Sequence, residues 1–160
     1  AHMAGQSDIA IQLIRTAINH APEYLSAHGN LGKVFLELGR FDEAIASYGK
    51  AIAINPHYAG AHATLGQALH NSGRTDEAIA SYKRSLKLDS KVANTHCNLG
   101  NAYLDKGEFD AAVASYRRAL AIRPDFAQVH CNLGSALKNQ GLVEEAIACY
   151  QQAIVLKPDY

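Results

Sequence analysis

The chain has 160 residues, of which 48% are hydrophobic and 19% charged, and 15 lysines and arginines balance 15 aspartates and glutamates. This composition is typical of a folded domain and excludes an intrinsically disordered chain. The charge balance leaves no basic excess to attract nucleic acid or anionic lipid. No apolar stretch approaches the roughly 18 residues that a membrane-spanning helix needs. We therefore expect neither nucleic acid nor a membrane as a partner.

Three cysteines occur in the chain, Cys97, Cys131 and Cys149. Their number is odd and no Cys-x-x-Cys pair is present, which argues against both a disulfide framework and a zinc site. Reduced thiols are usual in the cytosol. We expect a cytoplasmic protein that holds no metal and no other cofactor.

The first three residues look like the remnant of an expression tag, and we expect residues 1–7 to form a disordered start. Residues 8–24 then predict one helix. Its Ala10, Ile14 and Ala17 stand in the register of the second helix of the units that follow. We expect this segment to be half of a repeating unit.

From residue 25 onward the sequence repeats every 34 residues. A Leu-Gly pair, a second glycine, an alanine and a tyrosine all recur with this step, and a proline closes three of the four units. The members of these columns are Leu31-Gly32, Leu65-Gly66, Leu99-Gly100 and Leu133-Gly134; Gly39, Gly73, Gly107 and Gly141; Ala44, Ala78, Ala112 and Ala146; Tyr48, Tyr82, Tyr116 and Tyr150; and Pro56, Pro124 and Pro158. Chance does not produce four independent columns with one period.

Each unit predicts two helices, as residues 25–58 illustrate. The first is expected from about Ser26 to Leu38, with Gly39 as its C-terminal stop because glycine accepts a positive φ. The second opens near Asp42, which suits a helix N-terminus. Small residues at Gly32 and Ala44 are expected to let the two helices approach closely. The apolar stripes at helical spacing are Ala27, Leu31, Val34, Phe35 and Leu38, and then Ala44, Ile45, Tyr48, Ala51 and Ile52.

This spacing and order resemble the tetratricopeptide repeat. The resemblance implies an all-α fold, a right-handed superhelical solenoid of antiparallel helix hairpins. It divides the chain into the half repeat at 8–24 and four repeats at 25–58, 59–92, 93–126 and 127–160. Helices this short are marginal alone, so stability is expected to come from the stacking of neighbouring hairpins.

A histidine column stands where this family often has tryptophan, at His28, His62, His96 and His130. A metal or proton-relay ladder is one interpretation. Zinc needs ligands about 2 Å from one centre, whereas packed helices lie about 8–10 Å apart. We therefore expect rings that pack between helices with one nitrogen satisfied.

No enzyme signature is visible in the chain. Cys97 and Cys131 follow a histidine directly, but sequence neighbours on a helix point about 100° apart, which argues against a Cys-His pair. Neither a GxxxxGK phosphate loop nor a GxSxG nucleophile motif occurs. We do not expect this stretch to be an enzyme.

The resemblance implies that the first helix of each hairpin lines an inner groove. The positions that would face a peptide are polar and mostly uncharged, and they are Asn30, Lys33, Thr64, Gln67, Asn98, Asn101, Asn132 and Ser135. A carboxamide both donates and accepts, so it can pair with a peptide unit whatever the peptide's side chains are. The alternative is that these asparagines are polar surface residues or bridges between stacked helices.

Two branches of the family differ in this groove. The chaperone-binding branch uses a basic clamp for a C-terminal carboxylate, but the corresponding positions here are Gly29, Ala63, Cys97, Cys131, Ser26, Gly60, Asn94 and Gln128. We reject that type of adaptor. The Asn-Leu-Gly tripeptide and the recurring asparagine are similar to the repeats of O-linked N-acetylglucosamine transferases, although Thr64 interrupts the column.

Three functions follow from these observations. The first is a protein-binding scaffold that holds an extended peptide through Asn98, Asn101 and Asn132, with Asn30, Lys33 and Gln67 extending the track. The second is the substrate-recognition arm of a larger glycosyltransferase-like enzyme. The third is self-assembly of copies through uncapped terminal helices, where the exposed residues would include Ile9, Leu13 and Ile14 at one end.

Overall fold

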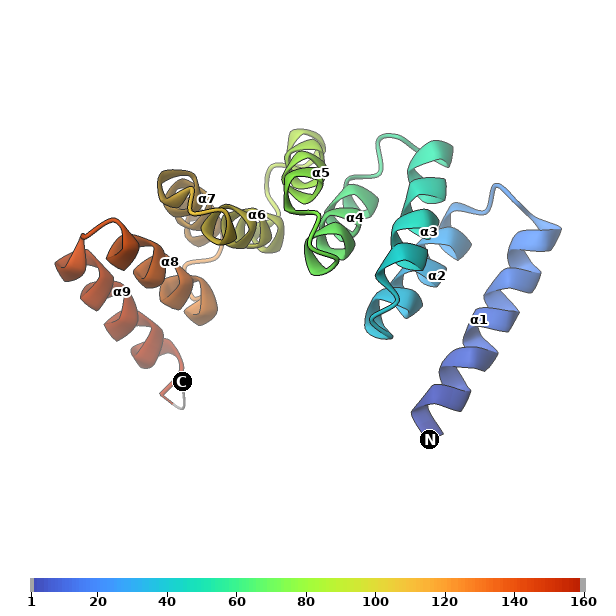
Figure 1. The fold of residues 1–160 in the computed structure, drawn as a ribbon, viewed down its shortest axis with the longest axis horizontal. Coiled ribbons are helices and arrows are strands. Elements are labelled where there is room, and N and C mark those ends of the chain that lie inside the picture. The colour runs from blue at the N-terminus through green and yellow to red at the C-terminus, as the bar shows by residue number, and fades with distance from the viewer. Residues whose placement is uncertain (1, 159–160) are drawn as a thin grey trace. The chain divides into compact units, whose positions relative to one another are not determined.

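The computed structural model describes the backbone of residues 2–158 and the side chains of residues 7–158, and it divides into two compact units, Ala1–Leu88 and Asp89–Tyr160. Every regular element in the described range is an α-helix (Figure 1), which confirms the predicted all-α class. The N-terminal unit contains α1 (His2–His20), α2 (Leu25–Glu37), α3 (Phe41–Ile54), α4 (Ala59–Asn71) and α5 (Thr75–Leu88). The C-terminal unit contains α6 (Ala93–Asp105), α7 (Phe109–Ile122), α8 (Ala127–Asn139) and α9 (Val143–Leu156).

Helix α1 begins at His2 and so includes most of the segment 1–7 for which we predicted disorder. No proline interrupts that segment, and proline is the residue that would stop a helix there. Ala1 lies outside the described residues. The division of the chain into a half repeat and four repeats stays a prediction.

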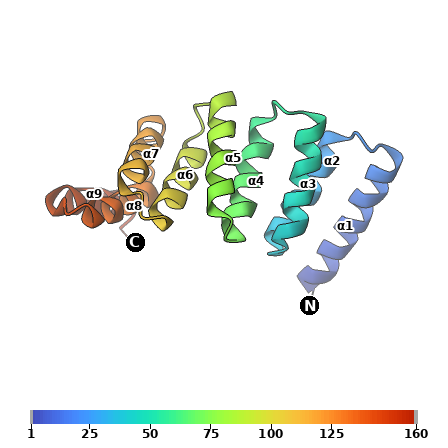
Figure 2. The ribbon, with the colours of Figure 1, turned by 45° about the horizontal axis from the view of Figure 1, so that its top comes forward.

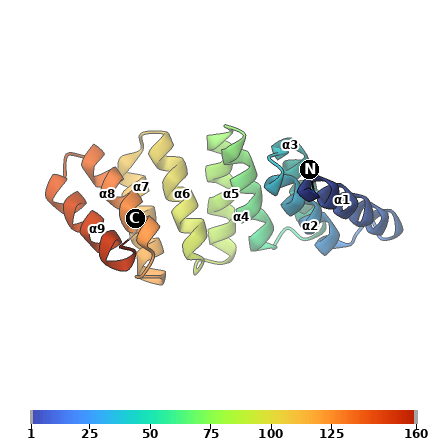
Figure 3. The same cartoon turned by 90° about the horizontal axis from the view of Figure 1, so that it is seen from below.

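The remaining helices pair as antiparallel hairpins, such as α2 with α3 and α4 with α5 in the N-terminal unit (Figure 2). In the C-terminal unit α6 pairs with α7 and α8 with α9 (Figure 3). Within each unit the second helix of one hairpin packs on the first helix of the next, as α3 does on α4 and α7 on α8. None of the described helices combines the length and the apolar character that a bilayer crossing requires.

The turn after each first helix is set by a glycine in the left-handed region. Gly39 has a φ of 70° and donates its N–H to Leu36 at 3.1 Å, while Arg40 donates to Phe35 at 2.8 Å. These two bonds are the Schellman pattern, which satisfies carbonyls at a helix end. The equivalent residues Gly73, Gly107 and Gly141 also have positive φ. The predicted glycine stop is therefore confirmed.

The Leu-Gly column and the tyrosine column form one packing feature. A Cβ added to Gly32 would lie 2.9 Å from Cζ of Tyr48, closer than side chains approach one another. Each of the other three repeats has the same contact, in the pairs Gly66 with Tyr82, Gly100 with Tyr116 and Gly134 with Tyr150. The missing side chain of Gly32 thus leaves room for the tyrosine ring, and Ala44 is fully buried, as the expected close approach of the two helices requires.

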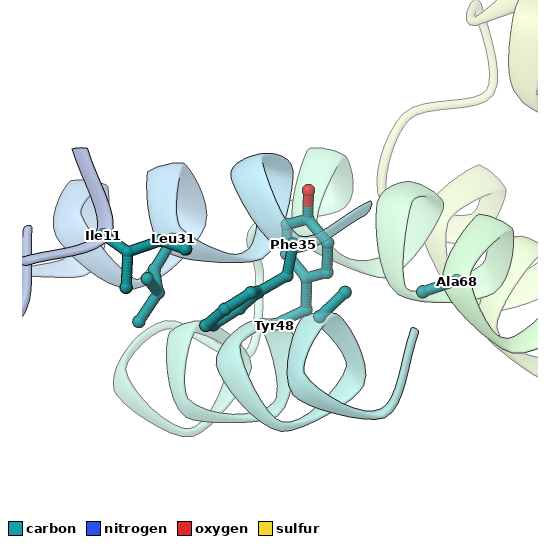
Figure 4. Packing of buried hydrophobic residues seen from close by; sticks show 6 residues of the cluster. Ile11, Leu31, Phe35, Tyr48 and Ala68 are labelled. Carbon is teal, nitrogen blue, oxygen red and sulfur yellow. The ribbon is translucent and has the colours of Figure 1, made fainter. Parts of the chain in front are cut away.

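The core of the N-terminal unit lies where α1, α2 and α3 meet. Ile11 of α1 lies beside Leu31, and Phe35 and Tyr48 fill the space between α2 and α3 (Figure 4). Leu38, which the sequence pattern placed on the apolar stripe, is exposed. That part of the prediction is wrong because α2 ends at Glu37 and Leu38 already belongs to the cap.

Each histidine of the column ties the start of a first helix to the segment before it. The ring Nε2 donates to the carbonyl oxygen six residues earlier, since a carbonyl can only accept. The four bonds are His28 to Pro22 at 2.8 Å, His62 to Pro56 at 3.0 Å, His96 to Ser90 at 3.0 Å and His130 to Pro124 at 2.9 Å. One ring nitrogen is satisfied at all four positions, as expected, and His28 and His96 are buried while His62 and His130 are half-buried.

Candidate functional site

A groove of about 620 Å³ lies between α2 and α4 in the N-terminal unit. Four of the eight residues predicted to face a peptide line it, namely Asn30, Lys33, Thr64 and Gln67. The structure therefore brings together the predicted residues of two successive first helices. Its volume falls in the range of about 300–1,000 Å³ that is usual for ligand sites.

The groove presents carboxamides that have no hydrogen-bond partner among the side chains and backbone that the structure describes. Asn30, Gln67 and Asn71 are exposed, and among the described residues none of their side chains makes a hydrogen bond. A free carboxamide offers a donor and an acceptor to a peptide N–H and C=O. These three side chains can therefore pair with a main chain without first breaking a bond inside the protein.

Thr64 and Tyr48 form the more buried part of the groove. The Thr64 hydroxyl donates to the carbonyl oxygens of Gly60, at 2.9 Å, and Ala61, at 3.2 Å, so it satisfies its own helix. Burial raises the pKa of Tyr48, while the hydrogen bond with Thr64 acts in the opposite direction. Tyr48 is therefore a neutral phenol at physiological pH and adds a polar atom without charge.

The charged residues of the groove offset each other. Lys33 and Glu37 lie one turn apart on α2, with 3.9 Å between Nζ and Oε1, and both are mostly exposed. Exposed pairs of this kind stabilise a protein by only about 0.2–1 kcal/mol. Their main effect here is that the groove carries no net charge from this pair.

Tyr58 is a groove residue that the sequence analysis did not identify. It is the residue before α4, and its ring is 43% exposed. A Cβ built on Gly60 would lie 3.1 Å from its Cε2, so the ring occupies the space that a side chain at that position would take. An aromatic column at Tyr24, Tyr58 and Phe126 carries the 34-residue period, and this signal could have identified the position.

In the C-terminal unit the predicted residues bond to one another. The Oδ1 atom of Asn101 accepts a hydrogen bond from the Tyr116 hydroxyl at 2.7 Å and another from Asn132 Nδ2 at 2.9 Å. Gln128 in turn donates to Oδ1 of Asn132 at 2.9 Å. This network, which we call the Asn101 network, joins α6, α7 and α8. Here the asparagines act as bridges between helices, the alternative that the sequence left open.

Two further predicted residues lie in the same unit. Ser135 donates to the Cys131 carbonyl at 3.2 Å, and its Oγ is also 3.2 Å from the Tyr150 hydroxyl. Asn98 is half-buried, and its carboxamide makes no hydrogen bond within the part of the chain that the structure describes. Of the four predicted residues in this unit, Asn98 is therefore the one whose carboxamide a peptide could reach without competition.

The thiols of Cys97 and Cys149 are held in their neutral form. Burial raises the pKa of Cys97 and of Cys149, which keeps both as neutral thiols at physiological pH. A neutral thiol is a poor nucleophile. Over the described residues, no three His, Cys, Asp or Glu side chains gather in a way that could hold a metal ion. The groove can therefore bind a ligand through hydrogen bonds and through its shape.

Comparison with family models agrees with the hairpin architecture. A TPR repeat model matches residues 32–73, 66–107 and 100–141, and a tetratricopeptide repeat model matches 127–160. The chain therefore belongs to the tetratricopeptide repeat family. Proteins of this family are protein-interaction scaffolds and are typically not enzymes.

Solved structures of this architecture are similar along almost the whole chain. MamA is 26% identical with a TM-score of 0.92, over 99% of this chain and 92% of that one. TTC0263, described as a thermophilic TPR protein in Thermus thermophilus, is 26% identical with a TM-score of 0.74, over 98% and 86%. YrrB, described as a TPR protein with an unusual peptide-binding site, is 18% identical with a TM-score of 0.83, over 99% and 82%, which shows the fold alone. A search of curated proteins finds no match.

Proposed function

We propose that this protein is a scaffold that binds an extended segment of a partner protein in the groove between α2 and α4. The observation that carries the proposal is the set of unpaired carboxamides of Asn30, Gln67 and Asn71 along one groove. Because each can donate and accept, a peptide main chain is their natural complement. The family's role as a protein-interaction scaffold supports the same conclusion.

The two units contribute differently in this proposal. Asn30 and Gln67 grip the peptide main chain, and Lys33 and Thr64 border it. In the C-terminal unit Asn98 is the carboxamide left for a peptide, while Asn101 and Asn132 hold their helices together rather than a peptide.

The experiment is a binding screen by fluorescence anisotropy with a library of unstructured peptides. We expect the Asn30→Ala/Gln67→Ala variant to lose most of its affinity for the selected peptides. The matched control is Gln151→Ala/Gln152→Ala, which removes two exposed amides from α9. Equal affinity of the groove variant and the control would overturn the proposal. Asn98→Ala and Asn132→Ala, made separately, distinguish a gripping residue from a bridging one.

Self-assembly is a second candidate function, and exposed apolar surface on α9 favours it. Ile147 is 50% exposed, whereas the equivalent Val113 of α7, which packs on α8, is 6% exposed. On α1, Ile9 and Leu13 are also exposed, while Ile14 is half-buried. Light scattering across a concentration series tests this proposal: rising mass supports it, and a constant monomer mass rules it out.

A third proposal is that the chain is the substrate-recognition arm of a larger glycosyltransferase-like enzyme. It rests on the Asn-Leu-Gly tripeptide and the recurring asparagine. The open reading frame of the parent gene decides it, because a catalytic domain beside these repeats is required.

A cytoplasmic location is part of our proposal and is supported by the three unpaired cysteines.

A further inference from the structure

Gly29 lies inside α2, at a place where the protein itself does not need a glycine. A Cβ built there would meet no atom within 4 Å, and its φ is not among the positive values. Gly32, one turn further, is different because the Tyr48 ring occupies the space of its side chain. Glycine is the least favourable residue in a helix interior after proline. The missing side chain at Gly29 therefore weakens α2 and leaves open space in the groove.

The space beside Gly29 has a defined chemical character. Gly60, on the opposite wall, also lacks a side chain, and the partly exposed Tyr58 ring lies against it. Lys33 and Glu37 offset each other, so a charged guest would find no unpaired counterion in this pair. The surface offered to a guest is thus the bare stretch of α2 at Gly29 and, on the other wall, the Tyr58 ring that covers Gly60.

We propose that this space is a subsite for an aromatic side chain of the bound peptide, which enters over Gly29 and packs against Tyr58. The inference rests on the proposed function of the groove. An aromatic ring gains from a second ring at about 4.5–7 Å between centroids in addition to the apolar area that it buries. Its flat shape suits a space bounded by the bare helix at Gly29 on one wall and by the Tyr58 ring on the other. The free carboxamides then fix the peptide main chain on both sides of this residue.

The test uses short blocked host peptides of serine, threonine and glutamine with Phe, Tyr, Leu, Arg or Ala at the central position. Binding is followed by NMR, through the amide resonances of Gly29 and Gly60. We expect the Phe and Tyr hosts to bind roughly tenfold more tightly than the Ala host. Gly29→Ala should weaken this preference, because the new methyl group takes up part of the space over α2 through which the ring enters.

Gly49→Ala is the matched control. Gly49 lies on α3, is exposed, and also has no atom within 4 Å of a built Cβ, but it is not part of the groove. Both substitutions should raise the Tm by roughly 2–4 °C, since alanine favours a helix. Only Gly29→Ala should change binding. The opposite signs of its effects on stability and binding exclude misfolding as the cause.

The outcomes distinguish a failure of the proposed peptide binding from a failure of the aromatic subsite alone. If no host peptide shifts the groove resonances, both the proposed function and the subsite are overturned. If all hosts bind equally, the groove binds peptides and the aromatic subsite alone is overturned. A preference for the Arg or the Leu host, or an unchanged Phe preference in Gly29→Ala, also overturns the subsite.

Discussion

The two units place the same repeat positions in different chemical roles. In the C-terminal unit Asn101 of one repeat bonds to Asn132 of the next. The corresponding residues of the N-terminal unit are Lys33 and Thr64, where Lys33 turns to Glu37 and the Thr64 hydroxyl bonds within α4. The first pair closes the space between neighbouring first helices, and the second leaves a groove. The repeat pattern therefore fixes where a residue lies on its helix, but the role of its side chain depends on which hydrogen-bond partner lies within reach.

The largest difference in stability between the two units is expected when a methyl group is added at the glycine–tyrosine contact of each. A Cβ at Gly100 would lie 2.5 Å from the Tyr116 ring, whereas at Gly32 the nearest Tyr48 atom is 2.9 Å away. We expect Gly100→Ala to destabilise the protein by up to about 3 kcal/mol, and Gly32→Ala by less. Native-state hydrogen exchange reports each unit separately. Equal protection losses in the two variants would contradict the packing difference.

Removal of the centre of the Asn101 network should have the next largest effect. Asn101→Ala leaves the Tyr116 hydroxyl and Asn132 Nδ2 without the acceptor that both now share. An unsatisfied buried polar group costs about 1–3 kcal/mol, and we expect a loss toward the lower end. Denaturant unfolding measures it. Thr64→Ala, at the equivalent place of Asn132, is the comparison and should cost less.

Alkaline pH should weaken the C-terminal unit through Tyr116. Burial raises the pKa of this fully buried phenol above its ordinary value of 10.0, so the unfolded chain ionises first. Its contribution to stability is complete below pH 10 and is lost as the pH rises above it. At pH 11 the loss is about 1.4 kcal/mol. The difference in unfolding free energy between the native chain and Tyr116→Phe should become smaller as the pH rises from about 10 to about 11. A constant difference would contradict the raised pKa of Tyr116 in the folded chain.

The smallest effect on stability is expected when the asparagine pair of the C-terminal unit is introduced into the N-terminal unit. Lys33→Asn/Thr64→Asn should install the C-terminal bridge in the N-terminal unit, adding about 0.5–1.5 kcal/mol to the unfolding free energy. The same variant should lose peptide binding, because the bridge between the two new side chains closes the groove between α2 and α4. Lys33→Ala/Thr64→Ala controls for the loss of the native side chains. Unchanged binding in the asparagine variant would mean that the groove does not depend on this pair.

The sequence by itself determined the architecture of this protein. Four columns with one period specified helix hairpins, and the glycine after each first helix specified where it stops because few other residues adopt a positive φ there. The resemblance to the tetratricopeptide repeat implied that Asn30, Lys33, Thr64 and Gln67 face one groove, and the structure shows these four residues along one groove. Local chemistry decides such features, so the sequence is sufficient for them.

Only the tertiary structure decided which of these residues are free. Asn101 and Asn132 are 31 residues apart, and their bond depends on how two hairpins stack. Helical periodicity gives the direction of a side chain but not the atom that it meets on the next helix. The Tyr58 ring and the open space at Gly29 also depend on that stacking. The hydrogen-bond partner and the empty volume are properties of the packed repeats, and no single repeat contains them.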